Sequence, residues 1–370
     1  MPVQKRIEDR FTNLRVEDFT YELPKELVAQ EPVKPRDMAR LLVVDRSTQA
    51  IAHKHFVELP HILTENDVLV INQTKVFPAR LLGVKPNGGK VEVLLLSEVE
   101  EGKWEALSKP GLVAGTGVKF SEKLAGVVVE PNNDEGVLTI KFSVVGERLK
   151  KMIEEVGLVP LPPYINSTQP QRQLKQDYQT VYANEWGSAA APTAGLHFTQ
   201  ASLKKLADEG VGIVPITLHV GLGTFQPVTN EHLKRKKLHL ERFCITRQTA
   251  EQILRAKAHG KRIVAVGTTT ARALESAAQV VGGKLSLTTE WQETELLIAP
   301  PFKFQVVDSL ITNFHLPQSS LLMLVTAFLS RPNTTEELKS FKESLLGKIY
   351  ELAVQERYRF YSFGDAMWIY

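Results

Sequence analysis

Six short apolar segments separated by turn signals narrow the possible folds of this chain more than any other feature of its sequence. They are Val68–Ile71, Lys90–Leu96, Lys103–Leu107, Gly117–Phe120, Leu124–Val129 and Val137–Phe142. Pro-Asn-Gly-Gly at 86–89 and Pro-Gly at 110–111 are typical of tight turns between strands. Six strands at this spacing predict a small antiparallel β-barrel.

The residues on both sides of these strands show a different pattern, in which helices and strands alternate. Before them, Arg40–Asp45 and Ile51–Phe56 predict a hairpin. After them we expect helices at Glu147–Val156, 199–209, 246–259 and 268–280, strands at Val211–Val220 and Arg262–Val266, and a last helical region that begins at the capping box Thr334/Glu337. Such alternation is typical of α/β proteins. We therefore predict a discontinuous α/β domain, residues 1–66 and 151–370, with an inserted small antiparallel β-barrel domain, residues 67–150.

The positive charge of the chain is concentrated in one short segment. The whole chain of 370 residues has a formal charge of only +3, which argues against a dedicated nucleic-acid binder. Residues 231–262, however, contain ten Lys and Arg against three acidic residues, a net charge of +7. Its candidate phosphate-binding residues are Lys234, Arg235, Lys236, Lys237, Arg242 and Arg247. A solvated charged loop is the alternative interpretation.

The sequence predicts a cytoplasmic protein that does not span a membrane. Its single cysteine, Cys244, cannot form an internal disulfide, and the N-terminus has no apolar signal-like core. The longest uncharged stretches are interrupted by His, Asn, Gly and Pro. No His-x-x-x-His or Cys-x-x-Cys pair occurs, so we expect no metal site.

Four segments combine small residues with groups that can perform acid–base or hydrogen-bonding chemistry. Residues 187–199 contain Thr193 and His197, residues 217–226 contain His219, Thr224 and Gln226, residues 267–275 contain Thr268, Thr269 and Arg272, and residues 311–321 contain Asn313 and His315. The third segment predicts a strand followed by a helix N-terminus, a favourable position for a carboxylate or phosphate. For each segment, a tightly packed loop or an ordinary helix cap remains an alternative.

Two further features could contribute to a site. His239 and Glu241 are two residues apart, which in a strand places an imidazole and a carboxylate on one face. Such a pair is a common acid–base arrangement. The aromatic C-terminus, residues 358–370, could stack on bases or form a buried final strand.

Together these segments resemble the S-adenosylmethionine:tRNA ribosyltransferase-isomerases of queuosine biosynthesis. The strings that match run from residue 18 or so to the end. They include residues 21–30, 72–81, 89–96, 161–165, 178–183 and 360–367 and the four segments above. The sequence departs from the family pattern at Gln73 and Lys75, at Pro301, and at Lys236, where the family often has a histidine.

The resemblance implies a specific reaction. The family transfers and isomerises the ribosyl part of S-adenosylmethionine onto 7-aminomethyl-7-deazaguanine at the wobble position of tRNA. The product is epoxyqueuosine, and adenine and methionine leave. S-adenosylmethionine is a co-substrate, and no metal or redox cofactor is implied. The implied partners are tRNA and S-adenosylmethionine, and we expect the chain to act as a monomer.

The chemistry requires a base for the proton on the 5′ carbon beside the sulfonium and a group that protonates the departing adenine. The candidate acid–base residues are His219, His197, His239, Glu241 and His315. The candidate substrate-binding residues are Thr193, Thr224, Gln226, Thr268, Thr269, Arg272 and Asn313. Two other classes remain open: an RNA-binding protein without catalysis, and an ordinary S-adenosylmethionine methyltransferase.

Overall fold

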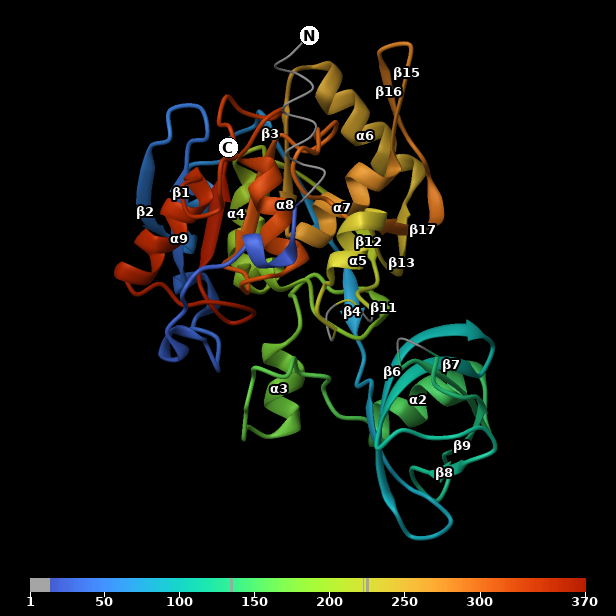
Figure 1. The fold of residues 1–370 in the computed structure, drawn as a ribbon. Helices are drawn as coiled ribbons and strands as arrows, with labels where there is room; N and C mark the ends of the chain where they lie inside the picture. The colour runs from blue at the N-terminus through green and yellow to red at the C-terminus, as the bar shows by residue number, and fades with distance from the viewer. Residues whose placement is uncertain (1–13, 134–135, 222, 224–225) are drawn as a thin grey trace.

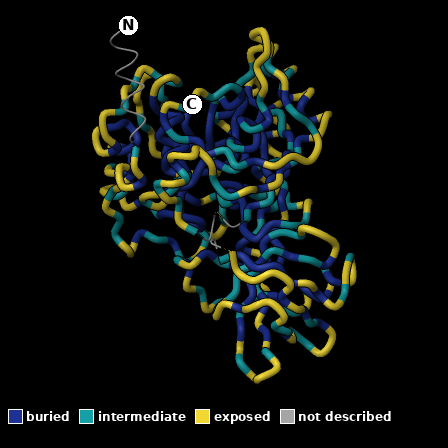
Figure 2. Tube along the Cα trace, turned by 45° about the vertical axis from the view of Figure 1, so that its right-hand side comes forward, coloured by how far each residue is buried: buried dark blue, intermediate teal, exposed yellow. Residues whose placement is uncertain are grey.

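The chain forms a mixed α/β sheet with a separate β-barrel beneath it (Figure 1). The structure is a computed structural model that describes residues 14–133, 136–221, 223 and 226–370. Buried residues fill the interior of both parts, and exposed residues line the turns of the barrel (Figure 2). This confirms the predicted fold class, an α/β sheet into which a small antiparallel barrel is inserted.

The central sheet has nine strands in the order β17-β13-β12-β3-β14-β18-β19-β1-β2. Their bounds are β1 Arg40–Val44, β2 Ile51–His55, β3 Asp67–Asn72, β12 Gly212–Leu218, β13 Lys237–Ile245, β14 Arg262–Val266, β17 Glu290–Leu296, β18 Ser309–Asn313 and β19 Ala366–Ile369. Strands β12, β3, β14 and β18 are parallel neighbours, so their carboxyl ends meet at one edge. The predicted hairpin is confirmed as β1–β2. The aromatic C-terminus forms a buried final strand.

The barrel is closed by six strands in the order β10-β7-β6-β5-β8-β9. Their bounds are β5 Arg80–Val84, β6 Lys90–Glu100, β7 Lys103–Lys109, β8 Gly117–Lys119, β9 Ala125–Glu130 and β10 Leu138–Phe142. Helix α2, Gly146–Val156, packs its buried Leu149 and Ile153 into the same core as Trp104. The barrel therefore depends on this helix for part of its apolar interior.

One predicted barrel strand is wrong. Val68–Ile71 lies in β3, in the middle of the central sheet, and the sixth barrel strand is β5 instead. All six residues of β3 are buried, as expected for a strand covered on both faces of a parallel sheet. Strand β5 was missed because Arg80 and Gly83 interrupt its short alternating pattern. The residues at which the two domains divide stay a prediction.

The helices lie mostly where the sequence predicts them. The remaining α-helices are α3 Gln171–Asp177, α4 Gln200–Asp208, α5 Asn230–Arg235, α6 Arg247–Ala258, α7 Thr268–Ala277, α8 Ser320–Phe328 and α9 Leu345–Gln355. Short 3-10 helices occur at Val16–Asp18, Lys25–Leu27, Arg36–Met38, Phe56–His61 and Thr193–His197. Thr199 and Thr246 cap α4 and α6 as expected, since each hydroxyl accepts a hydrogen bond from a backbone N–H of the first turn.

Two predicted helix boundaries are wrong. Helix α7 ends at Ala277 because the chain turns into a hairpin, β15 Ala278–Val281 and β16 Lys284–Leu287, at a Gly-Gly turn. The capping box at Thr334 begins no helix. The Thr334 hydroxyl donates to the carbonyl of Leu329, and α9 begins only after its own cap, Ser344. The Thr334 oxygen also accepts the backbone N–H of Glu336 at 3.1 Å, so this side chain closes a local turn that no helix continues.

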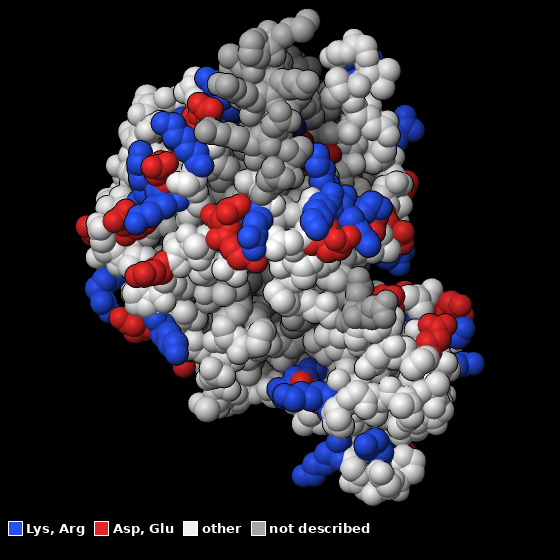
Figure 3. Space-filling model, in the orientation of Figure 1, with Lys and Arg blue, Asp and Glu red and all other residues white. Residues whose placement is uncertain are grey.

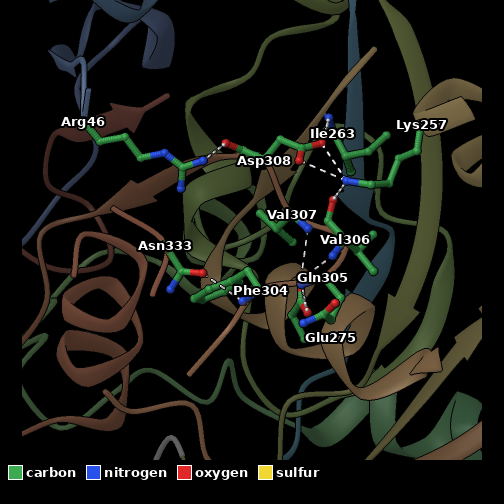
Figure 4. Close-up of polar contacts among 10 residues, drawn as sticks. All are labelled: Arg46, Lys257, Ile263, Glu275, Phe304, Gln305, Val306, Val307, Asp308 and Asn333. Atoms are coloured by element: carbon green, nitrogen blue, oxygen red, sulfur yellow. Dashed lines mark hydrogen bonds and ion pairs between the residues drawn. The ribbon is translucent and has the colours of Figure 1, made fainter. Parts of the chain in front are cut away.

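The segment before β18 is fixed by buried polar contacts (Figure 4). The carboxylate of Glu275 accepts the backbone N–H groups of Gln305, Val306 and Val307 at 2.8–3.0 Å. Burial raises the pKa of Glu275 in spite of these bonds. Asp308 pairs with Lys257 at 2.9 Å. These contacts set where β18 begins, and therefore where its carboxyl end lies.

The chain passes between the sheet and the barrel twice. Strands β4, Thr74–Val76, and β11, Glu185–Ser188, pair in parallel at this neck. The side chain of Asn72 bonds both the N–H and the C=O of Leu218 at 3.0 Å, which joins the end of β3 to the end of β12. None of the helices in the described ranges is long and apolar enough to cross a membrane.

Candidate active site

The four chemistry-bearing segments of the sequence meet at one edge of the central sheet. His219 follows β12, Thr268 begins α7 directly after β14, and Asn313 ends β18. In open α/β sheets, ligands bind outside the carboxyl ends of the strands. Two cavities open at this edge, one on each side of the segment 219–221.

The larger cavity, which we call the cleft, has a volume of about 590 Å³ and lies between the barrel and the sheet. Its sheet wall includes four predicted site residues: His219, His239, Glu241 and Arg242. Its barrel wall is formed by residues of β6 and β7, and Trp186 and Lys150 also line it. The cleft therefore exists only because the two parts of the fold face each other.

His219 is the most constrained imidazole of the cleft. Its Nδ1 lies 2.7 Å from the hydroxyl of Thr74, and its ring stacks on Trp291 with centroids 5.2 Å apart. Burial, with a smaller contribution from the nearby positive charge of Arg242, lowers its pKa to about 4. The imidazole is therefore neutral at physiological pH.

The backbone of Gly187 packs directly against this imidazole. A Cβ atom at position 187 would lie 2.9 Å from Nε2 of His219. Gly187 also has a φ of +145°, a conformation that side-chain-bearing residues rarely adopt. Both facts explain why a glycine stands at the start of the small-residue segment 187–199.

Glu241 forms a buried ion pair with Arg272. Its other carboxylate oxygen accepts the N–H of Gly221 at 3.0 Å. Burial lowers the pKa of Arg272 to about 10. Arg272, predicted to bind substrate, is thus held by a carboxylate of the protein, and this pair connects α7 to the cleft wall. His239 lines the cleft beside it, with its ring 5.0 Å from that of His232.

The smaller cavity, which we call the strand-end cavity, has a volume of about 100 Å³. Predicted substrate-binding residues line it: Thr193, Thr268, Thr269 and Asn313, together with His315. Tyr164 and Ser362 add hydroxyl groups, and no Lys, Arg, Asp or Glu is among the described residues that line it. It is a small, uncharged pocket at the N-terminus of α7.

Asn313 is the centre of a buried hydrogen-bond network beside this cavity. Its Oδ1 accepts from Thr193, and its Nδ2 contacts both Nε2 of His197 and the carbonyl of Tyr361, all at 3.1 Å. Its polar groups are thus already satisfied by protein partners. Asn313 therefore holds the cavity wall in place and has little capacity left for a ligand.

His197 and His315 are both buried and neutral. Burial lowers the pKa of each to about 3. Nε2 of His315 lies 2.6 Å from the Thr312 hydroxyl, and its backbone N–H donates to Tyr350 at 2.9 Å. His315 lines the strand-end cavity, whereas His197 lines neither cavity and packs against Phe56.

The predicted phosphate-binding residues lie around the end of α5, the start of β13 and the start of α6. Figure 3 shows Lys and Arg side chains gathered over α5 with acidic side chains directly beside them. The ion pairs are Arg235–Glu231 at 2.8 Å, Lys237–Glu295 at 2.6 Å and Arg247–Glu251 at 3.0 Å. Lys234 and Lys236 are exposed, and Lys236 ends α5 in a left-handed conformation. Arg242 lies apart from them, in the cleft and over Trp291.

The structure reveals site residues that the sequence reasoning missed. Thr74, which bonds His219, stands inside a string that matched the family, so a signal existed. Trp291, Glu98 and Glu105 are brought to the site only by tertiary contacts. Gln226 is half-buried, and Thr224 lies outside the described residues. Over the ranges that the structure covers, no group of three or more His, Cys, Asp or Glu could hold a metal ion.

The fold and the cleft define an enzyme in which an inserted barrel faces the strand ends of an α/β sheet. The model of the family "Queuosine biosynthesis protein" matches residues 16–369. The S-adenosylmethionine:tRNA ribosyltransferase-isomerase of Clostridioides difficile is 47% identical over 96% of this chain and 99% of its own. That of Halothermothrix orenii is 46% identical over 96% of this chain and 100% of its own.

A solved structure agrees with these matches. The crystal structure of an S-adenosylmethionine tRNA ribosyltransferase from Thermotoga maritima is 35% identical, covers 95% of this chain and 100% of its own, and has a TM-score of 0.52. The chain belongs to the queuosine biosynthesis protein family. It has the enzyme class of its relatives, that of S-adenosylmethionine:tRNA ribosyltransferase-isomerases.

Proposed function

We propose that the cleft is where this enzyme transfers and isomerises the ribosyl moiety of S-adenosylmethionine. The acceptor is 7-aminomethyl-7-deazaguanine at the wobble position of tRNA, and the product is epoxyqueuosine, with release of adenine and methionine. The observation that supports this location is His219, a neutral imidazole held by Thr74 and Trp291 in the wall of the cleft. The next residue, Val220, lines the strand-end cavity.

His219 acts as the base that removes the proton from the 5′ carbon beside the sulfonium. In the tautomer in which Nδ1–H donates to the Thr74 hydroxyl, 2.7 Å away, Nε2 is unprotonated and can accept that proton. The lowered pKa keeps the ring in this neutral form across the neutral range. His239 and Glu241 line the same cleft and are the candidates for protonating the departing adenine.

The strand-end cavity receives part of S-adenosylmethionine. The N-terminus of α7 and the hydroxyl of Thr268 line it, and free N–H groups at a helix N-terminus favour a carboxylate such as that of the methionyl group. Thr193 and Thr269 also line the cavity. Asn313 positions these groups, because its polar atoms are bound to protein partners, and Arg272 is held by its ion pair with Glu241.

The tRNA anticodon enters the cleft, and its phosphates contact the basic residues around α5 and β13. Strand β13 contributes to both places: Lys237 begins it, and His239 and Glu241 follow. The chain acts as a monomer in this proposal. The single cysteine agrees with a cytoplasmic location.

The test is the His219→Ala variant, assayed for adenine release with S-adenosylmethionine and tRNA that contains the aminomethyl base. Loss of a general base lowers rates by about 10²- to 10⁴-fold, and we expect a loss of about 10³-fold. His55→Ala is the control, because His55 is exposed and lines neither cavity.

Activity of His219→Ala within tenfold of the wild type would contradict the assignment. The products also separate the three classes of function. A methyltransferase leaves S-adenosylhomocysteine, a non-catalytic RNA-binding protein releases nothing, and the proposed reaction releases adenine and methionine.

A further inference from the structure

The barrel wall of the cleft carries two carboxylates, although the predicted site residues that line the cleft are all on its other wall. Glu98 on β6 and Glu105 on β7 line the cavity, and both are half-buried. Ser97 lies between them in the cavity wall. No part of the function described so far uses these carboxylates.

The β6–β7 ladder is irregular at this place. Its register shifts once between Leu95 and Ser97 and again between Glu98 and Glu100. Successive residues of a regular strand point to opposite faces, yet Ser97 and Glu98 both line the cleft. Bulges re-aim side chains in this way and are common next to active sites.

Both carboxylates are oriented by neutral donors. The Ser97 hydroxyl donates to Oε2 of Glu105 at 2.6 Å, and the Gly102 N–H donates to Oε1 of Glu98 at 2.9 Å. Across the described ranges, no Lys or Arg forms an ion pair with either residue. Three other acids of the barrel do have such partners, namely Glu92, Glu100 and Glu122. A carboxylate can accept several hydrogen bonds, so each retains capacity for a cationic donor.

An aromatic surface completes this wall. The ring of Trp186 is half-buried and lines the cleft, and it stacks on Phe77 with centroids 4.4 Å apart. Trp104 packs edge-on against it at 5.9 Å. The indole is therefore fixed in orientation. Unstacked nucleobases bind to such fixed aromatic rings.

We propose that the barrel wall is the recognition pocket for the modified base, in which Glu105 and Glu98 bind the aminomethyl ammonium while the ring stacks near Trp186. This inference rests on the proposed function, since it takes the acceptor base from it. It explains why a cleft that must admit a polyanion has two carboxylates without a basic partner: they select the one cationic group of the acceptor base. They are specificity-determining residues and take no part in proton transfer from the ribosyl donor.

The test measures binding to two anticodon stem-loops that differ only at the wobble base, 7-aminomethyl-7-deazaguanine or guanine. The wild-type chain should bind the aminomethyl form more tightly. In Glu105→Gln, and more so in Glu98→Gln/Glu105→Gln, the ratio of the two Kd values should fall by about tenfold, while the Kd for the guanine form stays unchanged.

Glu130→Gln is the matched control. Glu130 also accepts a hydroxyl hydrogen bond on a barrel strand, from Thr139 at 2.8 Å, but it does not line the cleft. Its Kd ratio should equal that of the wild type. Thermal unfolding of each variant checks that the barrel is intact.

Three outcomes would overturn the inference: no preference of the wild type for the aminomethyl form, equal weakening of both stem-loops in Glu105→Gln, or a change confined to the Kd for S-adenosylmethionine. The last would assign the carboxylates to the sulfonium. Because binding needs no turnover, these outcomes are distinct from failure of the proposed function, which appears as absence of adenine release by the wild type.

Discussion

The two cavities at the strand ends differ in size, charge and origin. The strand-end cavity, about 100 Å³, is enclosed by residues of the α/β part and has hydroxyl groups, and none of the described residues that line it is Lys, Arg, Asp or Glu. The cleft, about 590 Å³, has carboxylates and cations on walls from both parts of the fold. Segment 219–221 separates them.

This difference suggests a division of labour. A small cavity in whose wall Asn313 and His315 are held by protein hydrogen bonds is preorganised for one fixed ligand group. A wide cleft between two parts of a fold can admit a nucleotide that is still attached to a large RNA. We therefore expect the two cavities to differ in rigidity and in their relation to tRNA, and to share neutral, buried histidines.

The largest expected effect concerns the rigidity of the strand-end cavity. Asn313→Ala removes three hydrogen bonds and leaves the buried His197 and Thr193 without their partner. We expect the free energy of unfolding to fall by about 2–4 kcal/mol. Urea unfolding measures it.

Glu98→Gln in the cleft wall provides the comparison for that experiment. Its side chain is half-buried and can still accept the Gly102 N–H, so its effect should stay within about 0.5 kcal/mol. Equal effects of the two variants would remove the contrast in rigidity between the cavities.

The second prediction concerns the stability of the protein at acid pH. The pKa of His315 is about 3 and that of His219 about 4, both lowered by burial from the ordinary 6.5. Between pH 6.5 and these values the unfolded chain binds protons that the folded chain does not. Each histidine's contribution to stability is thus complete above pH 6.5 and is lost progressively as the pH falls.

Buried carboxyl groups with raised pKa values have the opposite effect, because their contribution to stability grows as the pH falls. Substitution of each histidine separates its contribution from theirs. From pH 7 to pH 5, His219→Gln and His315→Gln should each lose about 2 kcal/mol less stability than the wild type. His55→Gln, an exposed control, should follow the wild type. Parallel curves for all four proteins would contradict the assignment of neutral, buried imidazoles in both cavities.

The smallest effect is expected at the basic residues around α5. Lys234 and Lys236 have no ion pair within the described residues, whereas Arg235 and Lys237 are paired with glutamates. Lys234→Gln/Lys236→Gln should therefore weaken tRNA binding and flatten its salt dependence, by about 0.7–0.9 in slope for each lost phosphate contact.

Two single variants, Arg235→Gln and Lys204→Gln, are the controls for the salt dependence of tRNA binding. Arg235→Gln should change the slope less than the double variant, because Glu231 already balances its charge. Lys204→Gln on α4 should leave it unchanged. A slope unaffected by the double variant would indicate that these residues form a solvated loop with no contact to tRNA.

Local sequence patterns predicted the strands and helices whose signals are contained in the elements themselves. The barrel strands β6 to β10, the capped helices α4 and α6, and the strand β14 lie where they were expected. The errors arose where burial was decided by distant parts of the chain. Strand β3 looks like any apolar segment until it lies between β12 and β14, and Thr334 accepts the N–H of Glu336 in a turn that no helix continues.

The same distinction holds for the site. Residue type and spacing were enough to single out the histidines, the three threonines that begin α7 and the family, because each signal is contained in a short stretch of sequence. Residue type and spacing did not predict that these residues lie together. Their grouping depends on parallel strands, which place His219, Thr268 and Asn313 at one edge of the sheet. Pairing of Arg272 with Glu241, and the approach of Glu98 and Glu105 on the barrel, depend on contacts between segments far apart in the chain. The sequence by itself determines which side chains are present and which local element contains them. The ion-pair partners, the histidine pKa values and the cavities arise only when packing excludes water between distant segments.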